Sequence, residues 1–249
     1  GISCGWVWGF ADNISRDNRI EKNHIHHLGK KQLSDMGGIY LLGVQPGTVI
    51  RGNVIHDIEK KRYGGWGIYL DEGSSHIIVE NNIVYRTSCQ VFHQHFGREN
   101  ILRNNVFAFG EDGLIALSRG VDFYFPIKNA KAWADGHIGR AFTLERNILI
   151  SNGKPLIVGG LNGPDADLLT GSILSDANCV WDVSGEPPHC ADARLHQSPH
   201  HVFVFAEWQA HGFDIFSVVT DPKCASPETG DFTFDADSPA VGLGIKPID

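Results

Sequence analysis

The feature that most constrains this chain is a short recurring pattern: a run of β-branched residues or leucine, then a charged or polar residue, an asparagine and another apolar pair. Five copies place the asparagine at positions 23, 53, 82, 105 and 147, in steps of 30, 29, 23 and 42 residues. Self-similarity at this spacing marks a solenoid, and short apolar strands with a turn residue between them favour a β-solenoid over a helical one. The copies are residues 18–25, 48–55, 77–84, 100–107 and 142–149.

The asparagines are expected to turn the corner between two strands of each coil. Such a corner needs a left-handed or bridging backbone, which Asn tolerates, and stacked Asn amides can form a hydrogen-bonded ladder. The alternative is a β-sandwich of antiparallel hairpins, which predicts two-residue Asn-Gly turns between the repeated strands. The five segments contain none.

A second strand repeats in register with the first, over residues 38–43, 67–73 and 91–97. The first two copies are 29 residues apart, and strand alternation then places Ile39 over Ile68 inside and Tyr40 beside Tyr69 outside. The predicted fold is therefore all-β, a right-handed parallel β-helix. Its coils are expected over residues 1–160, and a last irregular coil and C-terminal cap are expected over residues 161–249.

The pattern weakens in the C-terminal third. Residues 168–174 are expected to add one more coil, residues 182–201 to form a loop, and residues 205–211 to form a short helix. The tail, over residues 229–240, is expected to be a strand and turn that cover the open end, because the end of a solenoid presents unpaired backbone groups.

Charge and cysteine content exclude several classes of function. The net charge of −8 argues against nucleic acid or an anionic membrane surface as a partner, since both require clustered Lys and Arg. No apolar run is long enough to cross a bilayer. The five cysteines include no Cys-x-x-Cys pair, so a structural zinc site is not expected. Cys179 and Cys190 flank a Gly/Pro segment and can form a disulfide if the protein is exported.

Acidic and aromatic residues gather on the predicted outer face. Glycoside hydrolysis needs two carboxyl groups beside the scissile oxygen, and Asp35 and Asp71, one coil apart, are the candidates. Aromatic rings stack on sugars, while carboxylates and imidazoles bind hydroxyls or move protons. The candidate substrate-binding residues are Tyr40, Trp66, Tyr69, Glu72, His93, His95, Arg98 and Trp8, with Trp6 nearby.

Each of these residues also has a plainer explanation. Asp35 can simply cap a turn, and Asp71 with Glu72 can belong to a solvated turn. The pair His93 and His95 shares one strand face, but the spacing specifies no third metal ligand, so no metal or cofactor is expected. Arg98 can bind an acidic sugar or be an ordinary surface residue. The histidines at 24, 26 and 27 are interpreted as polar surface residues.

Four segments resemble bacterial right-handed β-helix proteins of polysaccharide breakdown, and most closely the group around glycoside hydrolase family 141, which includes α-L-fucosidase and xylanase activities. They are residues 33–40, 63–75, 92–101 and 103–109. The resemblance implies that the family's acidic pair falls on Asp35 and Asp71. It also implies further coils and an export signal upstream of Gly1, and a secreted or periplasmic location. The chain departs from the family at Gln90-Val91, where two glycines are usual, and at Lys223-Cys224.

Three functions follow as expectations. The first is a glycoside hydrolase that cleaves a plant or algal polysaccharide with Asp35 and Asp71, their individual roles left open. The second is a polysaccharide lyase for uronic-acid polymers, with His95 or Tyr69 as the base and Arg98 as the positive neighbour. The third is a β-helix that binds carbohydrate without cleaving it.

Overall fold

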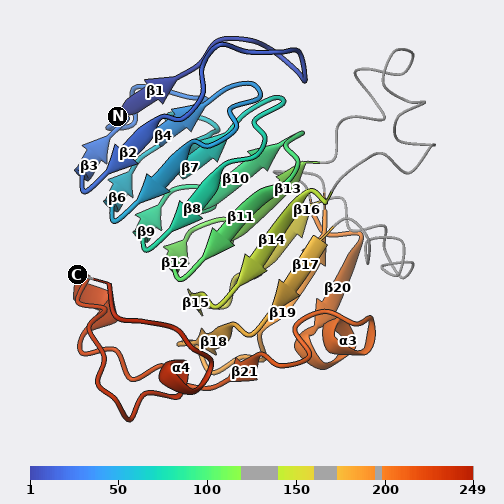
Figure 1. Cartoon of the computed structure of the whole chain (residues 1–249). Coiled ribbons are helices and arrows are strands. Elements are labelled where there is room, and N and C mark those ends of the chain that lie inside the picture. Colours follow the sequence, from blue (N-terminus) through green and yellow to red (C-terminus); the bar gives the residue numbers. More distant parts are fainter. Residues whose placement is uncertain (119–139, 160–172, 194–197, 249) are drawn as a thin grey trace.

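The computed structural model describes residues 1–118, 140–159, 173–193 and 198–248. Its strands form three sheets, and the chain passes through sheets A, B and C in turn before starting the next coil (Figure 1). Each strand from β1 to β18 therefore pairs with the strand one coil away in the same sheet, in parallel. This arrangement is the predicted parallel β-helix, and it excludes a sandwich of antiparallel hairpins.

Sheet A consists of β1 (Ile2–Cys4), β4 (Met36–Leu41), β7 (Gly65–Leu70), β10 (Phe92–His95), β13 (Ile115–Ser118), β16 (Ile157–Gly159), β19 (His189–Asp192) and β20 (His201–Val204). Sheet B consists of β2 (Arg19–Glu21), β5 (Val49–Arg51), β8 (Ile78–Glu80), β11 (Asn100–Arg103), β14 (Phe142–Glu145) and β17 (Ile173–Asp176). Sheet C consists of β3 (His24–Leu28), β6 (Val54–Ile58), β9 (Ile83–Thr87), β12 (Val106–Gly110), β15 (Ile148–Ser151), β18 (Cys179–Asp182) and β21 (Val218–Val219).

The core consists of apolar residues stacked in register between the sheets. In sheet A, Ile39 is paired with Ile68, and Ile68 with Phe92; all three are fully buried. Tyr40 is paired with Tyr69 on the opposite side of the same strands. The inward and outward positions predicted from strand alternation are thus confirmed.

The asparagine ladder is present, and it extends one coil further than predicted. The Nδ2 group of Asn53 donates to Oδ1 of Asn82 at 2.9 Å, and that of Asn82 donates to Asn105 at 3.0 Å. Asn147 continues the ladder to Asn178, a copy that the sequence pattern missed.

The left-handed corner residue was assigned wrongly, because it is the residue before each ladder asparagine. These corner residues are Lys22, Gly52, Asn81, Asn104, Arg146 and Ala177, with φ between 51° and 65°. The asparagine itself satisfies backbone groups: Asn82, for example, also donates to the carbonyl oxygens of Ile50 and Glu80. The left-handed turn is thus made one residue before the asparagine that bonds these carbonyl groups.

The C-terminal end of the solenoid is closed by β19, which lies within the segment predicted as a loop, and by β20 and α3, which follow β19. β19 continues sheet A, and β20 pairs with it antiparallel. The predicted helix is confirmed as α3 (Phe205–Ala210), and its Trp208 is fully buried in the same core as Phe203. Residues 182–201 were therefore wrongly read as loop alone. Of the extra coil expected at 168–174, residues 168–172 lie outside the described residues, and β17 begins at Ile173.

The tail does not cover the open end. It contains η2 (Pro227–Thr229) and α4 (Pro239–Gly242), and its Phe232, Ala240 and Ile245 pack on the outer face of sheet C. The C-terminus consequently lies beside the earlier coils (Figure 1). There the backbone N–H of Lys246 donates a hydrogen bond of 2.6 Å to Oδ1 of Asn104, the residue between β11 and β12 that turns the corner. The expected strand is absent from residues 229–240, which contain a turn at 236–237, and the tail covers the apolar outer face of sheet C instead of the open end.

The five cysteines, all within the described residues, are free thiols. Cys179 lies in β18 and Cys190 in β19, both buried, so the disulfide considered for them does not form in this structure. Among the described residues, no helix has the length and apolar character needed to span a membrane.

Candidate active site

Asp71 directly follows β7, and its carboxylate is held by donors from three sources. Oδ2 accepts a hydrogen bond of 2.6 Å from the Tyr40 hydroxyl, one coil earlier. Oδ1 accepts from the backbone N–H of Glu72 at 2.8 Å and lies 2.9 Å from Nδ1 of His95, one coil later. The stacking of three coils therefore positions this carboxylate, which is only 5% exposed.

The surroundings of Asp71 favour its ionised form. Burial alone raises the pKa of a carboxyl group, but the hydrogen bonds from His95, Tyr40 and the Glu72 backbone outweigh it and lower the pKa of Asp71. Burial, together with the Asp71 charge, raises the pKa of Tyr40 and of Tyr69 well above the usual value. Both phenols are therefore hydrogen-bond donors rather than bases at neutral pH.

Asp35 directly precedes β4 and lines the same two cavities of sheet A as Asp71. Its backbone is left-handed, with φ of 55°, and its N–H donates to the Tyr63 carbonyl oxygen at 3.1 Å. Its side chain is exposed. Asp35 also contacts the Tyr63 hydroxyl, and its charge raises the pKa of that phenol.

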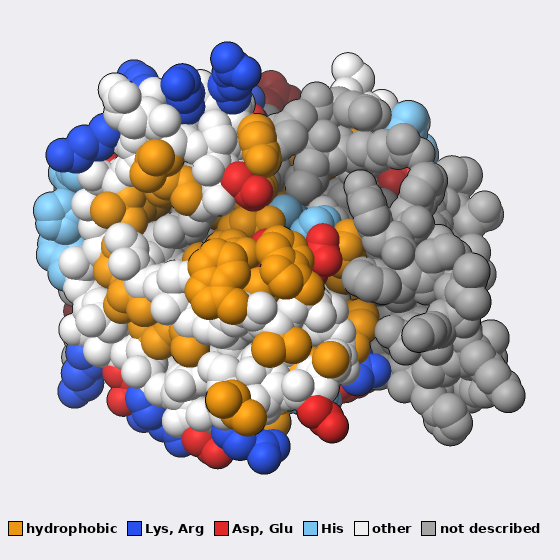
Figure 2. Space-filling model, turned by 90° about the horizontal axis from the view of Figure 1, so that it is seen from above, with side chains coloured by type: hydrophobic (Ala, Val, Ile, Leu, Met, Phe, Trp, Pro, Cys, Tyr) orange, Lys and Arg blue, Asp and Glu red, His pale blue; other side chains and the backbone are white. Residues whose placement is uncertain are grey.

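Two cavities meet at this acidic pair. One, of about 410 Å³, is bordered by Trp6 and Tyr40, and the other, of about 360 Å³, by Tyr63 and Glu72. Both are also lined by Trp8, Asp35 and Asp71. Their volumes lie in the range of small-molecule sites. The face seen in Figure 2 has hydrophobic side chains at its centre and acidic and histidine side chains beside them, which matches this lining.

The tryptophans play two different parts. Trp6 and Trp8 are 69% and 56% exposed, so their rings are free to stack on a ligand. Trp66, a candidate substrate-binding residue in the sequence analysis, lies inside β7 and is 2% exposed, with Nε1 donating to Gln90 at 3.0 Å. It can support the cavity floor, but its face is not open to a sugar ring.

Tyr69 and His93 share this supporting position. Their rings lie parallel, with centroids 4.9 Å apart, and the Trp66 ring lies 4.3 Å from each. Nε2 of His93 is 3.2 Å from the Ser118 hydroxyl of β13. Both side chains are buried, so we assign them to holding the cavity rather than to direct contact with an extended polymer.

Glu72 is the second acidic residue of the 360 Å³ cavity. Burial and the neighbouring Asp71 charge raise its pKa, although His95 acts in the opposite direction. Adjacent carboxyl groups with pKa values shifted in opposite directions are typical of acid and base partners. The sequence suggested Glu72 only as a substrate-binding residue.

Arg98 lies outside this site. It lines neither cavity, and its guanidinium lies 4.8 Å from the ring centroid of Phe10. Sequence reasoning, in turn, missed Ser118, although the register that aligns His95 with Ser118 was detectable from the segment Ile115–Ser118. Tyr63 is the first residue of the segment 63–75 and was not among the candidate site residues. Among the described residues, the side chains that converge enough to hold a metal ion are His27, His56 and Asp57 on sheet C, not the His93/His95 pair.

The comparisons with known proteins support the architecture. Residues 8–125 match the family model described as a right-handed beta helix region. No curated protein and no solved structure gives a significant match. The matched residues contain Asp35, Asp71, Trp8 and the pair His93 and His95, whereas Trp6 lies just before the matched range. The protein is thus an all-β chain whose site is built on a right-handed parallel β-helix.

Proposed function

We propose that this protein is a glycoside hydrolase that cleaves a plant or algal polysaccharide, in the manner of glycoside hydrolase family 141. The right-handed β-helix is a fold common to polysaccharide-degrading enzymes. The observation that carries the proposal is the Asp71 carboxylate, ionised and oriented by Tyr40 and His95, at the junction of two cavities that also share Asp35 and Trp8. A location outside the cytoplasm belongs to the same proposal.

In this mechanism the two cavities bind the sugars on either side of the scissile bond. Asp71 is the ionised member of the pair, either attacking the anomeric carbon or activating a water molecule. A protonated carboxyl group must then protonate the leaving oxygen. Asp35, which lines both cavities, is the first candidate for this proton donor. Glu72 is the second candidate, because its raised pKa favours the protonated carboxyl group.

Two observations favour hydrolysis over a lyase reaction. The described residues that line the cavities include no Lys or Arg, whereas a uronate substrate needs a positive neighbour. Burial also raises the pKa of Tyr69, which disfavours this residue as the base.

The test is turnover by Asp71→Asn, Asp35→Asn and Glu72→Gln on a panel of plant and algal polysaccharides, with new reducing ends as the signal. Asp71→Asn should lower kcat by about 10²–10⁴-fold, the usual contribution of a positioned acid or base. Of the other two variants, the one that removes the proton donor should also abolish the alkaline limb of the pH profile. Asp235→Asn, an exposed change on the C-terminal tail, is the matched control.

Other products would contradict the proposal. Ultraviolet-absorbing unsaturated ends would identify a lyase, and polymer binding without new reducing ends would identify a carbohydrate-binding solenoid. Unchanged turnover in both aspartate variants would exclude the two-carboxylate mechanism. Because Asp71 is buried, its substitution can also lower the stability of the fold. Urea denaturation of each variant measures this loss of stability separately from the loss of turnover.

A further inference from the structure

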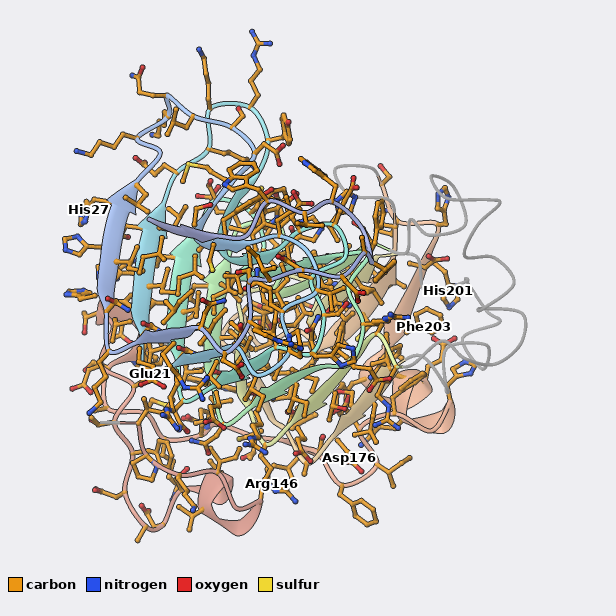
Figure 3. All side chains as sticks on the ribbon, turned by 45° about the horizontal axis from the view of Figure 1, so that its top comes forward. Glu21, His27, Arg146, Asp176, His201 and Phe203 are labelled. Atoms are coloured by element: carbon orange, nitrogen blue, oxygen red, sulfur yellow. The ribbon has the colours of Figure 1, made fainter. Side chains whose placement is uncertain are left out.

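A second cluster of polar side chains lies on the outer face of sheet C, away from the acidic cavities. Four imidazoles meet there: His24, His26 and His27 from β3 and His56 from β6, which is paired directly with His26. Neighbouring ring centroids in this group are 4.5–6.1 Å apart. His27 points outward from the edge of the solenoid (Figure 3).

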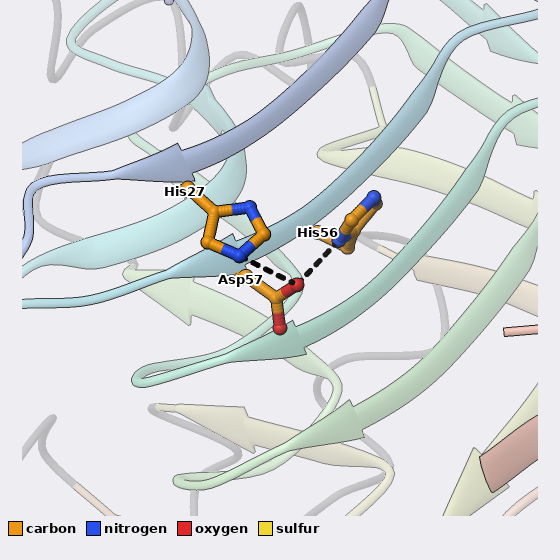
Figure 4. A group of neighbouring side chains, drawn as sticks. All are labelled: His27, His56 and Asp57. Carbon is orange, nitrogen blue, oxygen red and sulfur yellow. Dashed lines mark hydrogen bonds and ion pairs between the residues drawn. The ribbon is translucent and has the colours of Figure 1, made fainter. Parts of the chain in front are cut away.

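The carboxylate of Asp57 lies between two of these rings. Its Oδ2 is 2.6 Å from Nδ1 of His56 and 3.9 Å from Nε2 of His27 (Figure 4). One ligand atom from each of the three residues lies within 4.8 Å of the other two. His27 and Asp57 occupy equivalent positions one coil apart, both left-handed, so the coil repeat itself brings them together.

Small side-chain movements suffice to enclose an ion. Ligand atoms around a tetrahedral Zn²⁺, with bonds of about 2.0–2.1 Å, are roughly 3.3 Å apart. The His56–Asp57 contact must therefore lengthen, and the His27–Asp57 contact must shorten by a similar amount. The His27 side chain is 65% exposed and can rotate, and a cavity of about 400 Å³ bordered by His27 and Asp57 leaves room for water ligands.

A further imidazole can fix the proton of His56. Nε2 of His56 is 2.8 Å from Nε2 of His24, so a proton on the former can be donated to the latter. That tautomer leaves the Nδ1 lone pair of His56 directed toward Asp57. Nδ1 of His56 and Oδ2 of Asp57 are then two acceptor atoms 2.6 Å apart, which requires a proton or a cation between them. The hydrogen bond from Nε2 of His56 to His24 is of the kind that commonly orients a metal-ligating histidine.

We propose that His27, His56 and Asp57 form a binding site for a divalent first-row transition metal of the Zn²⁺ class, with His24 as a positioning residue. Two imidazoles and one carboxylate are borderline ligands that suit Zn²⁺, Co²⁺, Ni²⁺ or Cu²⁺ rather than Ca²⁺ or Mg²⁺. The site is independent of the proposed hydrolase reaction. It also revises the reading of His27 as a polar surface residue.

Arg86 is the competitor for this site. Its Nε donates to Oδ1 of Asp57 at 2.8 Å and its Nη2 to Oδ2 at 3.0 Å, one coil further along sheet C. A metal ion bound to Asp57 must share the carboxylate with Arg86 or displace the Arg86 guanidinium from it. The positive charges of the metal ion and of the guanidinium then lie close together and repel each other. Arg86→Gln is therefore expected to tighten metal binding, whereas a column of ordinary ion pairs predicts no metal binding in any variant.

The experiment is titration of the tag-free, chelator-treated chain with Zn²⁺ by calorimetry and with Co²⁺ by visible absorption. One equivalent should bind, and His27→Ala and His56→Ala should each weaken binding at least about tenfold, the scale seen when groups around a metal are removed. His200→Ala, an exposed histidine elsewhere, should bind like the unmodified chain.

The same titration can overturn the site. Absence of binding, or equal affinity in the unmodified chain and in His27→Ala, would show that the cluster is only a stacked ion-pair column. His27→Ala is the decisive variant because the His27 side chain is 65% exposed, so its removal leaves no cavity in the core. Thermal denaturation with and without Zn²⁺ is the independent check, since an ion that binds the folded chain raises Tm.

Discussion

At the scale of single residues, the site depends on the hydrogen bonds that protein groups make to one buried carboxylate, that of Asp71. Asp71 is removed from water, yet it keeps a lowered pKa because His95, the Tyr40 hydroxyl and the Glu72 backbone N–H replace the lost solvent. A group with a lowered folded-state pKa stabilises the fold above its unfolded pKa. That contribution is lost as pH falls through the folded-state value.

The residue-scale prediction concerns Tyr40→Phe, which removes the hydroxyl that donates to Asp71 at 2.6 Å. The change should raise the pKa of Asp71, and loss of a hydrogen bond to a charged group costs about 1.5–3 kcal/mol of folding free energy. Carboxyl carbon NMR shifts measured across the acidic range report the pKa without any assay of activity. The acid limb of the activity profile should move to higher pH in the same variant.

Tyr63→Phe is the control for this prediction, because the Tyr63 phenol contacts Asp35 and is half exposed. It should leave the Asp71 titration unchanged. An Asp71 pKa that is unaltered in Tyr40→Phe would show that His95 and the backbone alone hold the carboxylate.

At the scale of the structural element, each coil turns from sheet B into sheet C through one left-handed residue followed by the ladder asparagine. Gly52 occupies the left-handed position in one coil and Ala177 in the last, with φ of 65° and 56°. A side chain at this position costs roughly 1–2 kcal/mol unless it is Gly, with Asn and Asp partly exempt. The coils therefore differ in local strain although their shape is the same.

Two substitutions at this corner are predicted to have opposite effects. Gly52→Ala should destabilise the protein by about 1 kcal/mol, and Ala177→Gly should stabilise it by about 0.5–1 kcal/mol after the entropy of the unfolded Gly is allowed for. A Cβ at Gly52 meets only ordinary contacts, the nearest being Lys22 at 3.6 Å, so backbone strain is isolated from crowding. Urea denaturation measures both; changes of the same sign would contradict the strain argument.

At the scale of the whole molecule, the solenoid must protect its C-terminal end and the outer face of sheet C. β20 and α3 close the end, with Trp208 packed on Phe213 at a centroid distance of 4.1 Å. The tail covers sheet C through Phe232 and Ile245. Neighbouring coils contact mainly each other in such a fold, so stability is expected to vary along the axis.

The prediction at this scale is that Trp208→Ala loosens the C-terminal coils first. Truncation of a buried Trp costs about 3–5 kcal/mol, and its Nε1 also donates to Asp214 at 2.9 Å. Hydrogen exchange should accelerate in β19 and β20 more than in β4 and β7. Phe216→Ala, at a 73% exposed side chain, is the control; uniform acceleration along the chain would mean that the fold opens as one unit.

The sequence by itself determined the coil. Strand alternation and the corner asparagine are local properties that repeat with the chain, so the inward stacking of Ile39 on Ile68 and the outward pairing of Tyr40 with Tyr69 followed directly from spacing. The same register brought Asp35 and Asp71 to one cavity wall. Their catalytic roles stay predictions.

The tertiary structure alone decided which of these side chains face solvent and what holds them. His93 has an outward position in the pattern but is covered by the rings of Trp66 and Tyr69, and the Arg98 guanidinium contacts the Phe10 ring instead of a cavity. The sequence pattern likewise did not predict the path of the tail or the contact between His27 and Asp57. Period and register specify where a Cβ points, whereas burial, hydrogen-bond partners and pKa depend on rotamers and on segments that arrive from other coils.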